Sequence, residues 1–556
     1  MNPYYLTLML YIFLIYWFIV VALDRKGILE RYNISTIGPI LMIKTKRGGR
    51  LLERLSNGAS RERFWRIYAN IGTVLVLVAM AFMFILVIYG TYATFMVHPE
   101  PSKVNEPRNW LLIPGLNEFI PMCAWVGFVI ALVVHELSHA VLGTVEKIKV
   151  KSMGLLVALV PIGAFAELDS EQLFGEKEKK SGEEKIEATG AIDAEEPGKV
   201  RRKVATSRER TRILSAGVTS NFCVAFVAFL LFFAILFSVQ PVSDNVLYVY
   251  NVADGSPAEC FGMGAGMFIT AVDGSPVTRV EELNAALEGK EESVVTVLDK
   301  RGTERALVMH RGSESTGVTL LWVEKGLPAA KAGLTEGMRI TRMDTTSINS
   351  YDDFHAFMDR TKPAQIIEVQ TDEKAVSIEL ADSPFADIGY LGVLVANNPL
   401  GMFVVDFSAQ EYLGGLRSIP SSFTSFSPPR WLNSWLWLTA MPIAPLLAGG
   451  FGGFNPILSH LYEPVGVASL FGGGIFWIAD VLFWIGWINF YVGLFNCLPA
   501  IPLDGGYVFR EMLNPVLRLG IKDEGKKEKI SKVITATIAI FIASSIVFML
   551  AAPYVL

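Results

Sequence analysis

The stretch HELSH, at residues 135–139, lies inside the apolar run 119–145, which is long enough to cross a bilayer. Its two histidines are four positions apart, so on a helix they lie on one face and both imidazoles can reach one metal ion. Glu136, next to the first histidine, can hold and deprotonate a metal-bound water. Two imidazoles and a carboxylate are costly in hydrocarbon, so inside a span this pattern indicates a metal site rather than a chance helix face.

The composition supports a membrane protein with several spans. Hydrophobic residues make up 52% of the 556 residues and charged residues make up 19%. This balance is typical of a multi-span membrane protein with water-facing parts. The net charge of −5, with no basic stripe interleaved with aromatic residues, argues against a nucleic-acid partner. The four cysteines form no CxxC pair, so neither a disulfide framework nor thiolate zinc ligation is expected.

Apolar runs along the chain predict a polytopic α-helical membrane protein of about six spans. The predicted spans are residues 4–23, 67–96, 119–145, 213–239, 475–498 and 533–552. The loop 24–66 is rich in Lys and Arg, and the positive-inside rule places it in the cytoplasm. The N-terminus is then outside, and HELSH lies in the cytoplasmic half of the bilayer. We therefore expect an integral protein of the cell membrane, in contact with lipid.

The spans predict a domain organisation in which a membrane core is interrupted by an insertion. Residues 1–115 form an N-terminal two-span region with a basic cytoplasmic loop. Residues 116–240 form the first half of the core, and residues 475–556 form its second half and the last span. Residues 386–474 form a connecting region, in which the proline-containing apolar segment 431–448 is interpreted as a surface or re-entrant element.

Two segments of the first core half are not typical of spanning helices. Residues 153–166, MGLLVALVPIGAFA, are apolar but too short to span as a helix, and their Gly and Pro residues predict a hairpin. At membrane depth a hairpin must be sheltered by protein or line a cavity. Its edge could pair with an extended substrate strand, although a buried connecting loop fits equally well. Residues 167–212 are charged and poor in aromatics, which favours a flexible cytoplasmic loop.

An internal repeat occupies residues 244–381. Ser256-Pro257-Ala258 matches Leu327-Pro328-Ala329 at an offset of 71 positions (256 to 327), and the following glycines align at the same offset. Each unit ends in an amphipathic helix and a pair of strands. Two small α+β modules, at 244–311 and 312–385, are the simplest account. The topology of the spans places both modules outside the cytoplasm.

The third metal ligand must come from a distant part of the chain. A catalytic zinc site usually has three protein ligands and one open position, and HELSH provides two. The strongest candidate is Asp504, in the stretch NCLPAIPLDGG at residues 496–506. This stretch follows the fifth span at its cytoplasmic end, at the depth of HELSH. Its prolines and glycines break the helix and turn a carboxylate back toward the bundle, although the Asp-Gly pair taken alone favours a plain helix-ending turn.

These elements together resemble the site-2 protease family of intramembrane zinc metalloproteases. Besides HELSH and NCLPAIPLDGG, residues 217–221 (GVTSN) are similar to that family's GxxxN, and residues 464–466 are similar to its PVG element. The stretches SPAECFGMGAGMFITAVDGSPV and LPAAKAGLTEGMRITRMDTTSI each resemble a PDZ domain. Such domains bind peptide ends by strand addition, and a spacer or filter without a bound peptide is an equal alternative.

The resemblance implies hydrolysis of peptide bonds in or near transmembrane helices of membrane-protein substrates, as a step of regulated intramembrane proteolysis. One Zn²⁺ per chain would be held by His135, His139 and Asp504. Glu136 would take the proton of a water and pass it to the leaving amine.

The roles of two asparagines remain open, and two alternative functions remain for the whole chain. Asn221 and Asn496 are candidate donors to the oxyanion or to the substrate backbone, although either amide could instead tie two helices together. The chain could be an inactive membrane scaffold with PDZ modules. It could also be a membrane-anchored zincin that cleaves soluble or unfolded proteins and takes Glu167 as its third ligand.

Overall fold

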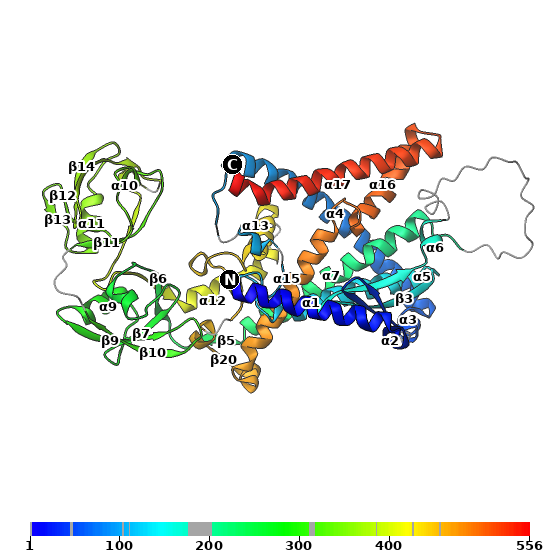
Figure 1. Cartoon of the computed structure of the whole chain (residues 1–556), viewed down its shortest axis with the longest axis horizontal. Coiled ribbons are helices and arrows are strands. Elements are labelled where there is room, and N and C mark those ends of the chain that lie inside the picture. The colour runs from blue at the N-terminus through cyan, green and yellow to red at the C-terminus, as the bar shows by residue number, and fades with distance from the viewer. Residues whose placement is uncertain are drawn as a thin grey trace, which may run out of the picture. The chain divides into compact units, whose positions relative to one another are not determined.

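The computed structural model divides the chain into two units. The helical unit comprises Met1–Phe232 and Asp480–Leu556, and the inserted unit comprises Phe233–Ala479. The structure describes residues 3–44, 48–102, 105–110, 112–158, 160–175, 203–310, 317–384, 386–424, 427–454 and 457–555. Figure 1 gives the order of the elements along the chain.

Five helices in the described residues are long and apolar enough to cross a membrane. They are α4 (Ala59–Val97), α5 (Ala124–Val145), α7 (Ser207–Leu236), α15 (Gly474–Asn496) and α17 (Glu524–Val555). Each coincides with one of the predicted spans. The remaining predicted span, 4–23, lies in helix α1 (Pro3–Arg25). The number of helices that cross the membrane stays a prediction.

Short helices complete the helical unit around the long ones. They are α2 (Ile28–Arg31), α3 (Gly48–Ser56), the 3-10 turn η1 (Pro107–Asn109), α6 (Ser170–Phe174) and α16 (Asp504–Gly520). A buried apolar cluster from α3, α4, α5, α6 and α7 surrounds the C-terminal half of α5. A second cluster joins α4, α7, α15, α16 and α17. The two clusters hold α5, α7 and α16 together, and these three helices build the site described below.

A four-stranded antiparallel sheet belongs to the helical unit, with the strand order β1-β2-β3-β4. The predicted hairpin at 153–166 is present as β3 (Val150–Ala158) and β4 (Val160–Leu168). The loop 24–66 contributes a second hairpin, β1 (Ile34–Ile37) and β2 (Ile40–Lys44), which was not predicted. Strand β2 pairs with β3, so β4 is left as an edge strand beside α5. Tyr16 Oη donates to the carbonyls of Pro39 (2.9 Å) and Val157 (3.2 Å), which ties α1 to both hairpins.

The predicted flexible loop 167–212 is partly helical, which corrects that expectation. Helix α6 starts directly after β4, because the Asp169 carboxylate accepts from the backbone N–H groups of Glu171 and Gln172. Helix α7 already begins at Ser207, behind a reciprocal cap between Thr206 and Glu209. The charged run 176–202 lies outside the described residues.

The inserted unit contains two six-stranded sheets. The first domain has the order β10 (Glu304–His310), β9 (Glu292–Leu298), β7 (Phe268–Val272), β6 (Asn245–Val252), β19 (Met402–Ser408), with β8 (Ser275–Pro276) beside β7. The second domain has the order β15 (Ala375–Glu379), β14 (Ile366–Thr371), β12 (Arg339–Met343), β11 (Val318–Val323), β18 (Val393–Val395), with β13 (Thr346–Ser347) beside β12. Each sheet is packed by two helices: α8 (Pro257–Cys260) and α9 (Val280–Leu287), then α10 (Pro328–Lys331) and α11 (Tyr351–Met358).

The second domain is inserted into the first, which corrects the predicted boundaries 244–311 and 312–385. Strand β19 completes the first sheet, yet it follows the whole second domain in the sequence. Strand β18 likewise closes the second sheet beyond residue 385. The 71-residue repeat stops before these strands, so it could not locate them. Repeat-equivalent amides hold the two closing segments: Ala253 N–H donates to Gly401 O (2.9 Å), and Glu324 N–H donates to Gly392 O (2.9 Å).

Short elements occupy the segment 381–474, which includes the predicted connecting region 386–474. They are β16 (Ala381–Asp382), β17 (Gly389–Tyr390), α12 (Ala409–Thr424), α13 (Pro428–Ala440), η3 (Leu446–Ala448), α14 (Leu458–Leu461), β20 (Tyr462–Pro464) and η4 (Gly466–Phe471), and β20 pairs with β5 (Val239–Pro241). Helix α13 has 13 residues, which corresponds to about 20 Å and is shorter than the hydrocarbon core. The segment 431–448 is therefore not one spanning helix, and its placement at the surface or as a re-entrant element stays a prediction.

Candidate metal centre

Helices α5 and α16 bring three potential metal ligands together. His135 and His139 face the same side of α5, and their Nε2 atoms are 3.2 Å apart. Asp504, the first residue of α16, places its Oδ2 atom 3.0 Å from His135 Nε2 and 3.1 Å from His139 Nε2. Both histidines are buried. Among the described residues, this trio forms the group of side chains that could hold a metal ion.

The spacing of these atoms fits a single tetrahedral cation. Two ligands at typical zinc distances of about 2.0–2.1 Å are roughly 3.3 Å apart in tetrahedral geometry. The three observed separations are close to this value. In neutral His139, Nδ1 carries the proton when it donates to a carbonyl, so Nε2 presents a lone pair. Lone pairs from an imidazole and a carboxylate that converge at this distance repel each other unless a cation or a proton lies between them.

Helix α7 forms the back of the site and sets the orientation of His139. The carbonyl of Ile213 lies 2.7 Å from His139 Nδ1, so it accepts that proton and leaves Nε2 free for a metal. Gly217 lies against both imidazoles. A Cβ atom at this position would be 2.5 Å from His139 Nε2 and 2.8 Å from His135 Nδ1. The glycine of the GVTSN stretch is therefore required because the rings occupy the space of a side chain.

The start of α16 explains why Asp504 is followed by two glycines. A Cβ atom at Gly505 would lie 2.4 Å from the Cys497 carbonyl oxygen, and one at Gly506 would lie 2.5 Å from the backbone of Ala500. The first turn of α16 thus packs directly on the turn that follows α15. Asp504 lies at the N-terminus of a 17-residue helix, where the helix dipole favours a negative charge.

The edge strand β4 contacts Glu136. Its Ala166 N–H group donates to Glu136 Oε2 at 2.9 Å, and it points away from β3. This bond holds one oxygen of the half-buried carboxylate and leaves the other oxygen available. A backbone amide as partner carries no signature in the residue type, so sequence patterns could not reveal it.

The structure gives the two candidate asparagines contacts of their own. The Asn221 amide is fully buried, and with its NH₂ group facing acceptors it donates to the carbonyls of Ala131 (3.3 Å) and Gly217 (3.2 Å). It thus links α7 to α5, as the alternative interpretation expected. Asn496 Nδ2 donates to Val492 O (3.0 Å) in its own helix. A role for either residue at the oxyanion stays a prediction.

Two further polar features lie near the site. Glu167 Oε2 accepts a hydrogen bond from Ser152 Oγ at 2.7 Å. Glu167 is not part of the ligand trio. A chain of hydroxyl groups links three helices: Ser138 Oγ lies 2.6 Å from Ser220 Oγ, which lies 2.8 Å from Tyr68 Oη. Ser138 occupies a variable position of the HExxH pattern, so the motif alone contains no sign of this chain.

A family model described as Peptidase family M50 matches residues 123–542, which include HELSH and Asp504. The chain belongs to peptidase family M50. This membership supports the predicted resemblance to site-2 proteases, and M50 is a family of zinc metalloproteases. With five span-length apolar helices among its described residues, this M50 family member is an integral membrane protein.

One relative is a protein of Methanocaldococcus jannaschii. The M50 chain is 28% identical over 163 residues to an uncharacterized protein of Methanocaldococcus jannaschii, MJ0971. The matched part is 28% of this chain and 40% of that protein, so the chain spans less than half of the relative's length.

Proposed function

We propose that this M50 peptidase is an intramembrane zinc metalloendopeptidase, which hydrolyses peptide bonds in or near transmembrane helices of membrane-protein substrates. The enzyme would act in one step of regulated intramembrane proteolysis. The proposal rests on the convergence of His135, His139 and Asp504 beside Glu136. These residues lie on α5, which is long enough to span, and on α16, which packs against other span-length helices. Family membership supports the same reaction class.

In this proposal each side chain has one task. His135, His139 and Asp504 would hold one Zn²⁺, which when bound polarises the scissile carbonyl and activates a water. Glu136 accepts the proton of the attacking water and passes it to the leaving amine. The Ala166 N–H group fixes Glu136 Oε2, so the second oxygen faces the reaction. The Ile213 carbonyl keeps the proton of His139 on Nδ1.

The edge of β4 is the surface that we propose for the substrate backbone. A helical substrate must unwind before its peptide bond is accessible, and an unwound segment can add to a sheet edge. The outer edge of β4 faces α5, and its Ala166 N–H group already touches Glu136. A strand added there runs past Glu136, so its peptide bonds come near the metal ligands. The β1–β2 hairpin supports this edge from the other side of the sheet.

We also propose an orientation in the cell membrane, with the N-terminus and both inserted domains outside the cytoplasm. The basic residues between α1 and α4 and the lysines after α5 (Lys147, Lys149 and Lys151) favour the cytoplasmic side. The metal ligands then lie in the cytoplasmic half of the bilayer.

The two inserted domains are proposed to be PDZ-like modules that select substrates by their peptide ends, and we assign the end-binding role to the second. Leu400-Gly401 and Leu391-Gly392 occupy equivalent loops, because they accept from repeat-equivalent amides. In the first domain, Asn398 occupies this loop: its Oδ1 accepts from Leu400 N–H (3.1 Å) and Met402 N–H (3.4 Å). Its own carbonyl accepts from Gly401 N–H.

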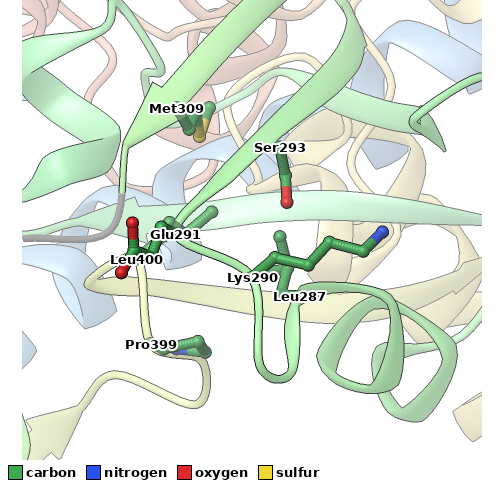
Figure 2. Close-up of a pocket in the computed structure, with 7 residues that line it drawn as sticks. All are labelled: Leu287, Lys290, Glu291, Ser293, Met309, Pro399 and Leu400. Atoms are coloured by element: carbon green, nitrogen blue, oxygen red, sulfur yellow. The ribbon is translucent and has the colours of Figure 1, made fainter. Parts of the chain in front are cut away.

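The groove of the first domain is closed in other places too. Asn284 of α9 donates to Asn397 O (3.1 Å), and Val280 N–H donates to Asp406 of β19 (2.9 Å). The hollow beside the loop has a volume of about 10 Å³, room for no more than about one water molecule. Figure 2 shows its lining, which consists of Leu287, Lys290, Glu291, Ser293, Met309, Pro399 and Leu400.

The corresponding loop of the second domain has no side chain that occupies it as Asn398 does in the first domain. The position of Asn398 is taken by Gly389, which has no side chain to donate or accept. Leu391 and Gly392 are buried, and no partner for their backbone N–H groups is found among the described residues. Buried unpaired N–H groups are rare and favour an anionic acceptor such as a peptide carboxylate.

The proposed reaction is tested with purified full-length protein in lipid vesicles and a panel of tagged single-span proteins, with product ends mapped by mass spectrometry. We expect one zinc per chain, product ends in or next to the span, loss of cleavage on chelation, and recovery with added Zn²⁺. Absence of both zinc and cleavage would instead support the inactive scaffold. Cleavage of unfolded soluble proteins, but of no single-span protein, would support the membrane-anchored zincin.

The selection role is tested by excising residues 311–396 and joining the ends with a short Gly-Ser linker. This excision removes the second domain but keeps every strand of the first, because the second domain is inserted into it. We expect the preference for externally trimmed over full-length substrate to disappear, measured as the ratio of the two cleavage rates. Unaltered cleavage of the trimmed substrate serves as the control for an intact core. A preserved preference would rule out this role.

A further inference from the structure

Two arginines near the start of α7 each hold the carboxylate of another helix. Arg210 forms a bidentate ion pair with Glu511 of α16: Nε donates to Oε1 (2.8 Å) and Nη2 donates to Oε2 (2.9 Å). Ser207 Oγ donates to the same carboxylate at 2.7 Å. Arg212 Nη1 donates to Oε1 of Glu146, at the end of α5, at 3.0 Å. Both carboxylates are buried, with exposed fractions of 4% for Glu511 and 2% for Glu146.

The two carboxylates occupy equivalent places relative to the metal ligands. Glu511 follows Asp504 by seven positions (504 to 511), and Glu146 follows His139 by seven positions (139 to 146). Seven residues correspond to about two helical turns, so each pair lies near one face of its helix. Each half of the metal site is therefore tied to α7 two turns away from its ligand.

We infer that Arg210 and Arg212, with Glu511 and Glu146, form a clamp that sets the position of Asp504 relative to the histidines. None of the four touches the ligand atoms, so they are positioning residues. The inference rests on the proposed metal site. A metal site must hold its ligands within about 0.5 Å of the working geometry, which requires support outside the ligands themselves. Between them, Ile213 and Gly217 of α7 touch both histidine rings, so the two arginines of the clamp and the back of the site belong to one helix.

The use of ion pairs rather than apolar contacts supports a positioning role. Burying an ion pair gains little stability over apolar residues of similar volume, because the charges lose their hydration. A bidentate arginine–carboxylate pair does fix the relative orientation of two planar groups. The clamp therefore specifies the geometry of α16 against α7 more than it contributes to stability.

The test replaces the Arg210–Glu511 pair by apolar residues in the full-length protein. The double variant Arg210→Met with Glu511→Leu is expected to keep its melting temperature and to lose roughly 10–100-fold in zinc affinity, the range typical of residues that support metal ligands. Zinc affinity is measured by competition with a chromophoric chelator. For the cleavage reaction, we expect kcat to decrease and KM to stay unchanged. Arg210→Lys keeps the positive charge but cannot form the bidentate pair. Its zinc affinity is expected to lie between those of the wild type and the double variant.

A matched control and three outcomes complete the design. Arg305→Met breaks an ion pair of similar length with Asp299 (2.8 Å) in the inserted unit, and zinc affinity should not change. Unchanged affinity in a stable double variant would overturn the clamp while the proposed protease stands. If the double variant unfolds, Arg210→Lys decides, and unchanged affinity there overturns the clamp as well. Wild-type protein without zinc would overturn both the clamp and the proposed function.

Discussion

Replacing Glu136 by glutamine is expected to slow cleavage of a single-span substrate by about 10²–10⁴-fold, the usual contribution of a general base. The amide keeps the size of the side chain and can still accept from Ala166 N–H, so the position of β4 should not change. It cannot take a proton from water at neutral pH. Zinc content should stay at that of the wild type, because Glu136 is not among the three candidate ligands.

The control for this variant is Glu167→Gln. Glu167 lies at the end of β4 and is bonded to Ser152, so its change should leave both zinc content and cleavage unaltered. Rates are measured from product bands in vesicles, and zinc is measured by mass spectrometry of the metal. Cleavage by Glu136→Gln at the wild-type rate would contradict the mechanism. Loss of zinc in Glu167→Gln would instead identify the membrane-anchored zincin.

Gly217→Ala is expected to abolish stoichiometric zinc binding and, with it, cleavage. The added methyl group would lie 2.5 Å from His139 Nε2 and 2.7 Å from His135 Cε1, so both rings must move. A shift of this size exceeds the tolerance of about 0.5 Å that a metal site allows. The effect should therefore be much larger than that of an alanine elsewhere on a helix, where alanine is favoured over glycine by about 1 kcal/mol.

Gly493→Ala provides a matched control on α15. A Cβ atom there would lie 2.7 Å from Phe222 Cε1, so the steric conflict is similar, but no metal ligand is involved. We expect Gly493→Ala to lower the melting temperature while binding one zinc per chain. The comparison of zinc content against melting temperature separates damage to the site from damage to helix packing. Full zinc binding by Gly217→Ala would contradict this prediction, because it would show that both imidazole rings can shift and still bind the metal.

Much of the site could be predicted from local patterns. HELSH presents two imidazoles to one side because the helical repeat places residues four apart on one face. Asp504 was predicted because a break after a span can turn a carboxylate back, and it does lie within 3.1 Å of both histidine Nε2 atoms. The hairpin at 153–166 also followed from composition, since an apolar run with Gly and Pro is too short to span as a helix.

Other parts of the fold could not be predicted because their signals are not local. Strands β1, β2 and β18 have three to five residues, too few for a periodic pattern to stand out from a loop. Strand β19 closes a sheet whose other strands lie far back in the sequence, before an entire domain. The repeat was visible in the sequence, but the insertion of one domain into the other depends on which distant segments pair.

The sequence by itself therefore determined the candidate ligand set, the candidate general base and the helical character of the membrane core, because residue type and helical periodicity are local properties. Only the tertiary structure decided what holds those residues in place. The Ile213 carbonyl on His139, the Ala166 amide on Glu136 and the arginine pairs on α5 and α16 are contacts between distant segments. Backbone groups have the same chemistry at nearly every residue, and in a sequence the residues of a buried ion pair look like any other charged residues. HELSH becomes half of a candidate metal site because α7, α16 and β4 meet around it.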